Sequence, residues 1–120
     1  MTSARECLDR AKQSGDAWQR PVNAFIDEFR RAPDAERHAM MADAISEQGE
    51  LEGLVAAVVS ALCREVGITP APWVGEIGSP TPFFALPAKS FEMRLRLMIE
   101  SPPAFRVRNV FVPENYLSRA

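Results

Sequence analysis

Apolar residues recur with the spacing i, i+3, i+4, i+7 through the first half of the chain, which is typical of amphipathic helices with one buried face. A first helix is predicted over residues 4–14, with Thr2 or Ser3 as its N-cap and Gly15 as its stop. A second helix begins at Pro21, because proline is tolerated in the first turn of a helix. These two helices are expected to bury Ala4, Cys7, Leu8, Ala11, Val22, Phe25, Ile26 and Phe29.

Two further helices are predicted in the middle of the chain. The third opens at Ala32-Pro33-Asp34 and breaks at Gln48-Gly49. Its apolar members are Met40, Met41, Ala44 and Ile45. The fourth runs from Leu51 to Val66 and is closed by Gly67. Its valines also suit a strand, but an apolar pattern of about sixteen residues at helical period exceeds ordinary strand length, so we expect the central, most buried helix here.

Residues 67–89 change character, since their prolines and glycines exclude any long regular element. The segment nevertheless carries Ile68, Trp73, Val74, Ile77, Phe83, Phe84 and Leu86. Because this apolar area is too large to leave in water, we expect an ordered, proline-stiffened strap that wraps the helices. Trp18, just ahead of the second helix, is likewise expected to pack into the core rather than to bind a ligand.

The segment after this strap admits two interpretations. Its apolar residues alternate as in a strand: Phe91, Met93, Leu95, Leu97 and Ile99. However, Phe91, Leu95 and Met98 also share a helical face, and the composition favours a helix. Ser90 is a suitable N-cap and Ser101-Pro102-Pro103 a stop, so we predict a helix up to Glu100.

The C-terminal tail is expected to be docked on the body because it is rich in apolar side chains. These are Phe105, Val107, Val110, Phe111, Val112, Tyr116 and Leu117. The predicted fold class is therefore all-α: one domain over residues 1–120, a compact bundle of about four to five helices with the strap and the docked tail. Met40, Met41 and the remainder of Phe83-Phe84 suit either a dimer surface or core packing, which leaves a homo-oligomer open.

Composition fits an ordinary globular domain. The chain has 120 residues, of which 47% are hydrophobic and 25% charged, with a formal net charge of −2. These values argue against a disordered, collagen-like or disulfide-stapled chain. No apolar run reaches the roughly 20 residues that cross a bilayer, and the first residues are polar, so we expect a cytoplasmic protein without a membrane partner. Cys7 and Cys63 are expected to be reduced, buried thiols.

Catalytic and metal-binding motifs are missing from the sequence. His38 is the one histidine, and no Cys-x-x-Cys, His-x-x-x-His, Gly-x-Ser-x-Gly or phosphate-loop pattern occurs. We therefore predict no catalytic residue, no metal and no cofactor, and lean away from an enzyme. The enzyme alternative requires His38 in a pocket beside a carboxylate or Cys63.

Charge is divided unevenly along the chain. Residues 1–60 hold seven basic and eleven acidic side chains, whereas residues 61–120 hold seven basic and five acidic ones. The basic residues from position 89 onward are Lys89, Arg94, Arg96, Arg106, Arg108 and Arg119. These residues admit two interpretations. Together with the nearby aromatic residues they form a docking surface for an acidic protein or RNA, or they are ordinary solvated side chains. The predicted helix 51–66 offers almost no donors to base edges, so we expect no sequence-specific DNA binding.

Five stretches carry a resemblance to a known family. They are Trp18-Gln-Arg-Pro-Val, Ala61-Leu-Cys-Arg-Glu-Val-Gly, Ala71-Pro-Trp-Val, Glu100-Ser-Pro-Pro-Ala-Phe-Arg-Val-Arg-Asn-Val-Phe-Val and Leu117-Ser-Arg-Ala. Together they resemble a family of small uncharacterised bacterial proteins over nearly the whole chain. The same module occurs in that family behind a helix-turn-helix domain, next to nucleotidyltransferase-like proteins of the abortive-infection or toxin–antitoxin kind. No such domain precedes the module in these 120 residues, so we do not expect autoregulation by DNA binding.

The resemblance implies a partner-binding module, such as the antitoxin-like or regulatory half of a two-gene system. The alternatives are a small enzyme and an RNA-associated protein. For the module, the residues expected to contact a protein partner are Arg94, Arg106, Arg108 and Asn109 through polar groups, and Trp73 as an aromatic anchor.

Overall fold

Helices dominate the computed structural model, which describes residues 1–118. The α-helices are α1 (Ala4–Gln13), α2 (Gln19–Arg31), α3 (Asp34–Met40), α4 (Glu50–Val66), α5 (Phe91–Glu100) and α6 (Pro103–Arg106). The shorter elements are the 3₁₀ helices η1 (Gly15–Ala17) and η2 (Pro72–Glu76) and the strands β1 (Phe83–Phe84) and β2 (Val110–Phe111). The prediction of a compact, mostly helical fold is confirmed.

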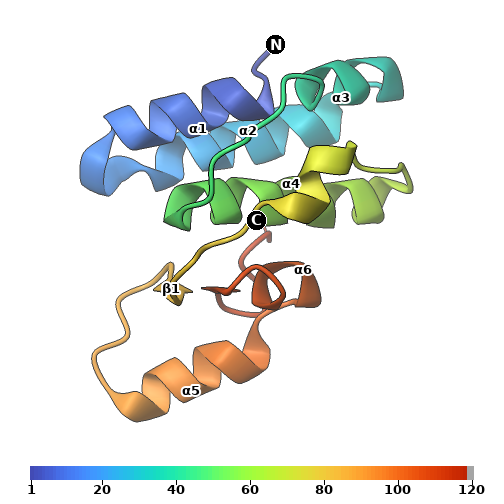
Figure 1. The fold of residues 1–120 in the computed structure, drawn as a ribbon. Helices are drawn as coiled ribbons and strands as arrows, with labels where there is room; N and C mark the ends of the chain where they lie inside the picture. Colours follow the sequence, from blue (N-terminus) through green and yellow to red (C-terminus); the bar gives the residue numbers. More distant parts are fainter. Residues whose placement is uncertain (119–120) are drawn as a thin grey trace.

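Helix α4 is the centre of the fold. Figure 1 shows α1 and α2 lying over one side of α4, while α6 lies on the other side. Ten of its 17 residues are buried, as expected for the most apolar segment of the chain. Gly67 closes the helix in the left-handed conformation, with φ of 77°. At Gly53 the helix approaches another backbone so closely that a Cβ would lie 2.8 Å from the nitrogen of Ser79.

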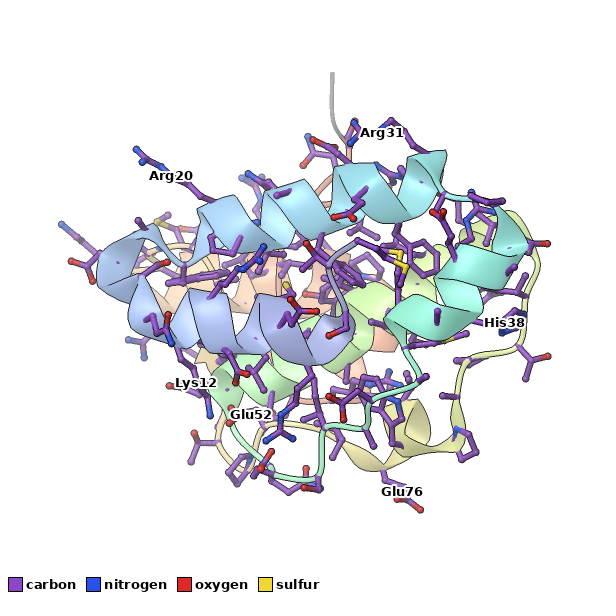
Figure 2. All side chains as sticks on the ribbon, turned by 90° about the horizontal axis from the view of Figure 1, so that it is seen from above. Lys12, Arg20, Arg31, His38, Glu52 and Glu76 are labelled. Carbon is purple, nitrogen blue, oxygen red and sulfur yellow. The ribbon has the colours of Figure 1, made fainter. Side chains whose placement is uncertain are left out.

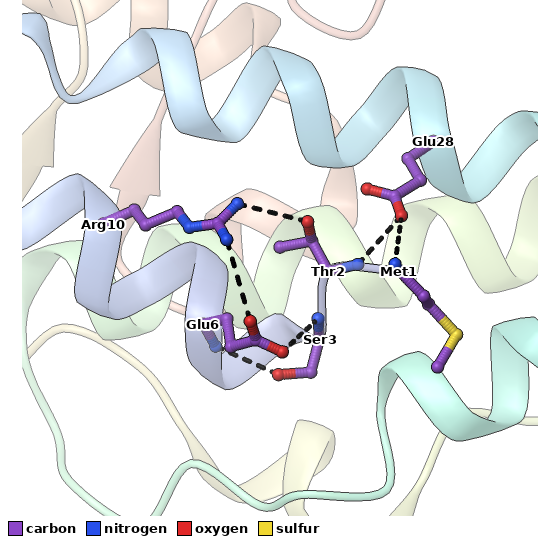
Figure 3. A network of polar contacts seen from close by, with 6 residues as sticks. All are labelled: Met1, Thr2, Ser3, Glu6, Arg10 and Glu28. Atoms are coloured by element: carbon purple, nitrogen blue, oxygen red, sulfur yellow. Dashed lines mark hydrogen bonds and ion pairs between the residues drawn. The ribbon is translucent and has the colours of Figure 1, made fainter.

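Polar contacts secure the start of α1 (Figure 3). The Ser3 hydroxyl accepts the N–H of Glu6 at 3.1 Å, and the Glu6 carboxylate accepts the N–H of Ser3 at 3.3 Å. This reciprocal pair identifies Ser3, one of two residues predicted for the role, as the N-cap. The Thr2 N–H donates instead to Glu28 of α2 at 2.8 Å, which ties α1 to its neighbour.

A buried carboxylate joins α4 to α1. Glu52 is only 6% exposed, and its carboxylate forms an ion pair with the Lys12 ammonium (Figure 2). The same carboxylate folds back over Gly49, so that a Cβ at Gly49 would overlap it. The glycine ahead of α4 therefore leaves room for the first turn of the helix to bury an acid.

The predicted extent of the third helix is wrong. Helix α3 ends at Met40, and residues 41–49 cross irregularly to α4 instead of continuing to Gln48-Gly49. The Met41 carbonyl accepts the indole N–H of Trp73 at 2.8 Å, and the Ala44 carbonyl accepts from Arg5 at 3.2 Å. Donors from distant segments thus replace the hydrogen bonds that a longer helix would have made.

Some residues of the segment 67–89 enter the core, and others form backbone hydrogen bonds with residues 108–111. Trp73, Val74 and Ile77 enter the core, and the Ser79 N–H donates to the Arg108 carbonyl at 2.8 Å. Strand β1 then pairs in parallel with β2, with Phe83 opposite Val110 and Phe84 opposite Phe111. The sequence pattern did not predict these strands, because two residues are too few to show an alternating period.

The residues after α6 return to the helical body. Val112 is fully buried, the Tyr116 hydroxyl donates to Gln19 at 2.6 Å, and Arg30 donates to the Leu117 carbonyl at 2.8 Å. Arg119 lies outside the described residues. Within the described part of the chain, every helix is too short or too polar to cross a bilayer.

Both cysteines are free and buried, which confirms their predicted state. Cys7 Sγ donates to the Pro21 carbonyl at 3.7 Å, and Cys63 Sγ lies 3.7 Å from Met41 Sδ. Met40 and Met41 are at most 2% exposed. Core packing, rather than a dimer surface, accounts for these methionines.

The thiols are expected to resist alkylation in the native protein. Burial raises the pKa of Cys7 to about 12 and that of Cys63 to about 11, and the thiolate is the reactive species. At pH 8 we expect no iodoacetamide adduct by mass spectrometry without denaturant and two adducts in concentrated urea. Rapid alkylation of the folded protein would show that one of the two sites is open to solvent.

Candidate interaction surface

The residues 90–100 form the predicted helix rather than a strand. The Ser90 hydroxyl accepts the N–H of Met93 at 3.1 Å, which caps the start of α5. At the other end Ser101, only 2% exposed, accepts the N–H of Val112 at 2.8 Å. This contact fixes the C-terminal end of α5 to the residue that directly follows β2.

Most apolar side chains of α5 are exposed, whereas Leu97 is half-buried. No residue of this helix is buried. Its large exposed hydrophobic residues are Phe91 at 81%, Ile99 at 66%, Met93 at 49%, Leu95 at 44% and Met98 at 42%. A single exposed apolar residue is ordinary, but a contiguous group on one element marks an interaction surface.

Four of these side chains lie on one face of α5. Each residue of an α-helix turns by about 100° from the one before. Leu95, Met98 and Ile99 follow Phe91 at intervals of four, seven and eight residues, so all four lie within about a third of the circumference. We call these residues the α5 stripe. Met93 lies on a different side and is also exposed.

Few contacts join α5 to the body. Figure 1 shows this helix apart from the layers that α1, α2 and α4 form, linked to them by loops at both ends. The Arg94 guanidinium lies 5.8 Å from the centre of the Phe84 ring, and its Nε donates to the Ala88 carbonyl at 3.1 Å. Arg96 and Glu100 pair along the helix at 3.7 Å. Exposed contacts of this kind stabilise a helix only weakly.

Three residues predicted to contact a partner make hydrogen bonds within the fold. Trp73 is 8% exposed, and its indole N–H donates to the Met41 carbonyl. Arg108 donates to the carbonyls of Ala104 at 2.7 Å and Val74 at 2.8 Å. Asn109 adopts a positive φ of 64° at the turn into β2, and its side-chain amide donates to Ser79 at 3.3 Å. Their roles as partner contacts stay untested predictions.

Burial also changes the chemistry of Arg108. Desolvation lowers the pKa of its guanidinium, and its Nε is buried without a hydrogen-bond partner. By contrast, Arg94 and Arg106 are exposed. Arg94 belongs to α5 and Arg106 ends α6, so these two of the predicted polar contacts border the α5 surface.

The structure places the two residues that the enzyme alternative singled out, His38 and Cys63, in different surroundings. His38 is exposed on α3, and Figure 2 shows it at the margin of the molecule. Cys63, in contrast, is fully buried. Among residues 1–118, no three His, Cys, Asp or Glu side chains are placed to hold a metal ion.

The α5 stripe was missed as a site because periodicity alone does not say which face of a helix is covered. One sequence feature could have indicated this surface. The apolar helix is flanked by proline-containing connections, with Pro87 before it and Pro102-Pro103 after it. No protein-family model, curated protein or solved structure matches the chain. The exposed apolar surface of α5 is therefore the feature of the molecule that bears on its function.

Proposed function

We propose that the protein is a non-enzymatic protein-interaction module in which α5 is the recognition helix, inserted into an apolar cleft of a partner protein. The observation that carries this proposal is the exposure of α5, whose five large apolar side chains cover no part of the protein's own core. Aromatic and aliphatic side chains at helical spacing are the usual anchors of a helix bound in a groove.

A cleft fits α5 better than a flat surface or a second α5. The helix has ten residues and is therefore about 15 Å long. A stable interface covers about 800 Å² on each partner, which two helices of this length in side-by-side contact do not reach. The α5 stripe and Met93 are exposed on different sides of the helix. Only a partner that contacts the helix from more than one side, as the walls of a cleft do, covers both.

The charges of α5 favour a protein over a membrane or RNA. Glu92 and Glu100 balance Arg94 and Arg96 along the helix. Anionic lipid surfaces and RNA both select a polar face dominated by Lys and Arg. Apolar contact would therefore supply most of the affinity, while Arg94 and Arg106 at the border of the stripe would pair with acidic groups at the rim of the cleft.

The family resemblance narrows the choice of partner. It suggests an antitoxin-like or regulatory role in the cytoplasm, with a nucleotidyltransferase-like protein as the bound component. In this proposal the proline-stiffened strap of residues 67–89 leads into α5 and positions the helix away from the bundle.

Photochemical cross-linking tests this proposal. Leu95 is replaced by the photoreactive residue benzoylphenylalanine, and the matched control carries it at the exposed Ala39 on α3. Each variant is irradiated with a purified nucleotidyltransferase-like protein from the same genome. We expect a covalent one-to-one adduct from position 95 and none from position 39.

The other outcomes are equally decisive. A complex that forms without an adduct at position 95 would exclude α5 as the recognition helix. The absence of any complex would overturn the assignment of a nucleotidyltransferase-like partner. A covalent dimer of this chain alone would assign α5 to self-association.

A further inference from the structure

A second surface lies beside β1, and no residue of α5 is among those that line it. A groove of about 480 Å³ runs between the turn from α1 to α2 and residues 83–87. Trp18 and Phe83 form part of its wall, with ring centres 5.9 Å apart. Five consecutive residues, from Phe83 to Pro87, line it, so this wall follows the course of the chain.

The backbone of β1 has one unpaired edge. The Phe83 N–H donates to the Asn109 carbonyl at 3.0 Å, and the Ala85 N–H donates to the Phe111 carbonyl at 3.0 Å. In a parallel ladder the residue between two such donors points its N–H and C=O away from the partner strand. Phe84 is that residue. Within residues 1–118 the sheet has two strands, so no strand lies beside the other edge of β1.

We propose that this groove binds an extended peptide segment of a partner protein, which adds to β1 as a third strand and carries a basic side chain. An exposed strand edge recognises extended peptides through backbone hydrogen bonds, and pockets beside it select the side chains. Here Phe84 supplies the backbone groups, and the rings of Trp18 and Phe83 supply an apolar floor.

The charge of the groove selects the basic side chain. Asp16 is exposed on its rim and is the one ionisable residue among those that line it. Gln19 also lines the groove, but its amide already accepts from Tyr116 at 2.6 Å and donates to Asn23 at 2.9 Å. A Lys or Arg of the peptide therefore pairs with Asp16.

Selection from a random 12-residue peptide library displayed on phage tests this inference on the full chain. Phe84→Pro removes the outward N–H and spares both ladder donors, while Phe84→Ala removes only the ring and is the matched control. We expect selected peptides to alternate apolar residues and to contain Lys or Arg. Their affinity should fall about tenfold further on Phe84→Pro than on Phe84→Ala, and also fall on Asp16→Lys.

Further controls separate this surface from α5. The selected peptides should bind the Phe91→Asp/Ile99→Asp variant with the same affinity as the wild type. Peptide binding to the groove can therefore be tested even if the α5 proposal fails. Circular dichroism melting checks that each variant is folded. A failure to enrich any peptide, or equal binding to Phe84→Pro and Phe84→Ala, would overturn the inference. A dimer that Phe84→Pro dissociates would assign the edge to a second copy and overturn it too.

Discussion

Replacing Phe91 and Ile99 together by aspartate is expected to weaken binding of the proposed nucleotidyltransferase-like partner at least a hundredfold while leaving the protein folded. Anchors that fill a cleft cost about 2–4 kcal/mol each when removed, and a carboxylate in their place must also be desolvated. Both residues are more than half exposed in the free protein, so their replacement should change the free energy of unfolding by only about 0.5 kcal/mol. Calorimetric titration and urea unfolding measure the two quantities.

Val107→Asp is the matched control for this experiment. Val107 is 77% exposed and apolar but lies outside α5, so the same kind of change there should leave affinity intact. An equal loss of affinity in the control would point to a general effect of added negative charge. Unchanged affinity in the double variant would remove the α5 stripe from the interface.

Phe105→Ala is expected to destabilise the protein by about 3–5 kcal/mol, the usual effect of emptying a large buried site. Phe105 is fully buried in α6, and its ring meets Tyr116 edge-on at 5.5 Å between ring centres. Its loss would leave a cavity between α4, α6 and the C-terminal residues. Urea unfolding monitored by circular dichroism gives the difference in free energy.

Phe91→Ala provides the comparison within the same chain. Phe91 is 81% exposed, so this substitution should alter stability by no more than about 0.5 kcal/mol. Similar destabilisation by both substitutions would mean that α5 packs on the body in solution. A small effect of Phe105→Ala would show instead that α6 contributes little to the core.

Most helices could be predicted because their apolar periods are long and their ends carry recognisable caps. Ser3, Gly67 and Ser90 all occupy the expected capping positions. The third helix was predicted too long because its apolar pattern continues to Ile45, which is buried although it is not helical. Burial by an irregular segment and burial by a helix face give the same local pattern.

The predicted partner contacts failed to indicate the α5 stripe for a similar reason. Arginine and tryptophan are enriched both at interfaces and where a chain must be tied together. Trp73 and Arg108 use their donors on backbone carbonyls of distant segments, which no local pattern reveals. Conversely, the side chains of Phe91 and Leu95 have the residue types of a core, and only the three-dimensional arrangement shows that both are exposed.

Hydrogen exchange of α5, measured with and without the nucleotidyltransferase-like protein, tests the recognition-helix proposal most directly. A helix of ten residues with few tertiary contacts is marginally stable, so its amides should exchange much faster than those of α4 in the free protein. In the complex we expect the α5 amides to become protected while those of α4 stay unchanged. Strong protection of α5 in the free protein, or none in the complex, would contradict the proposal.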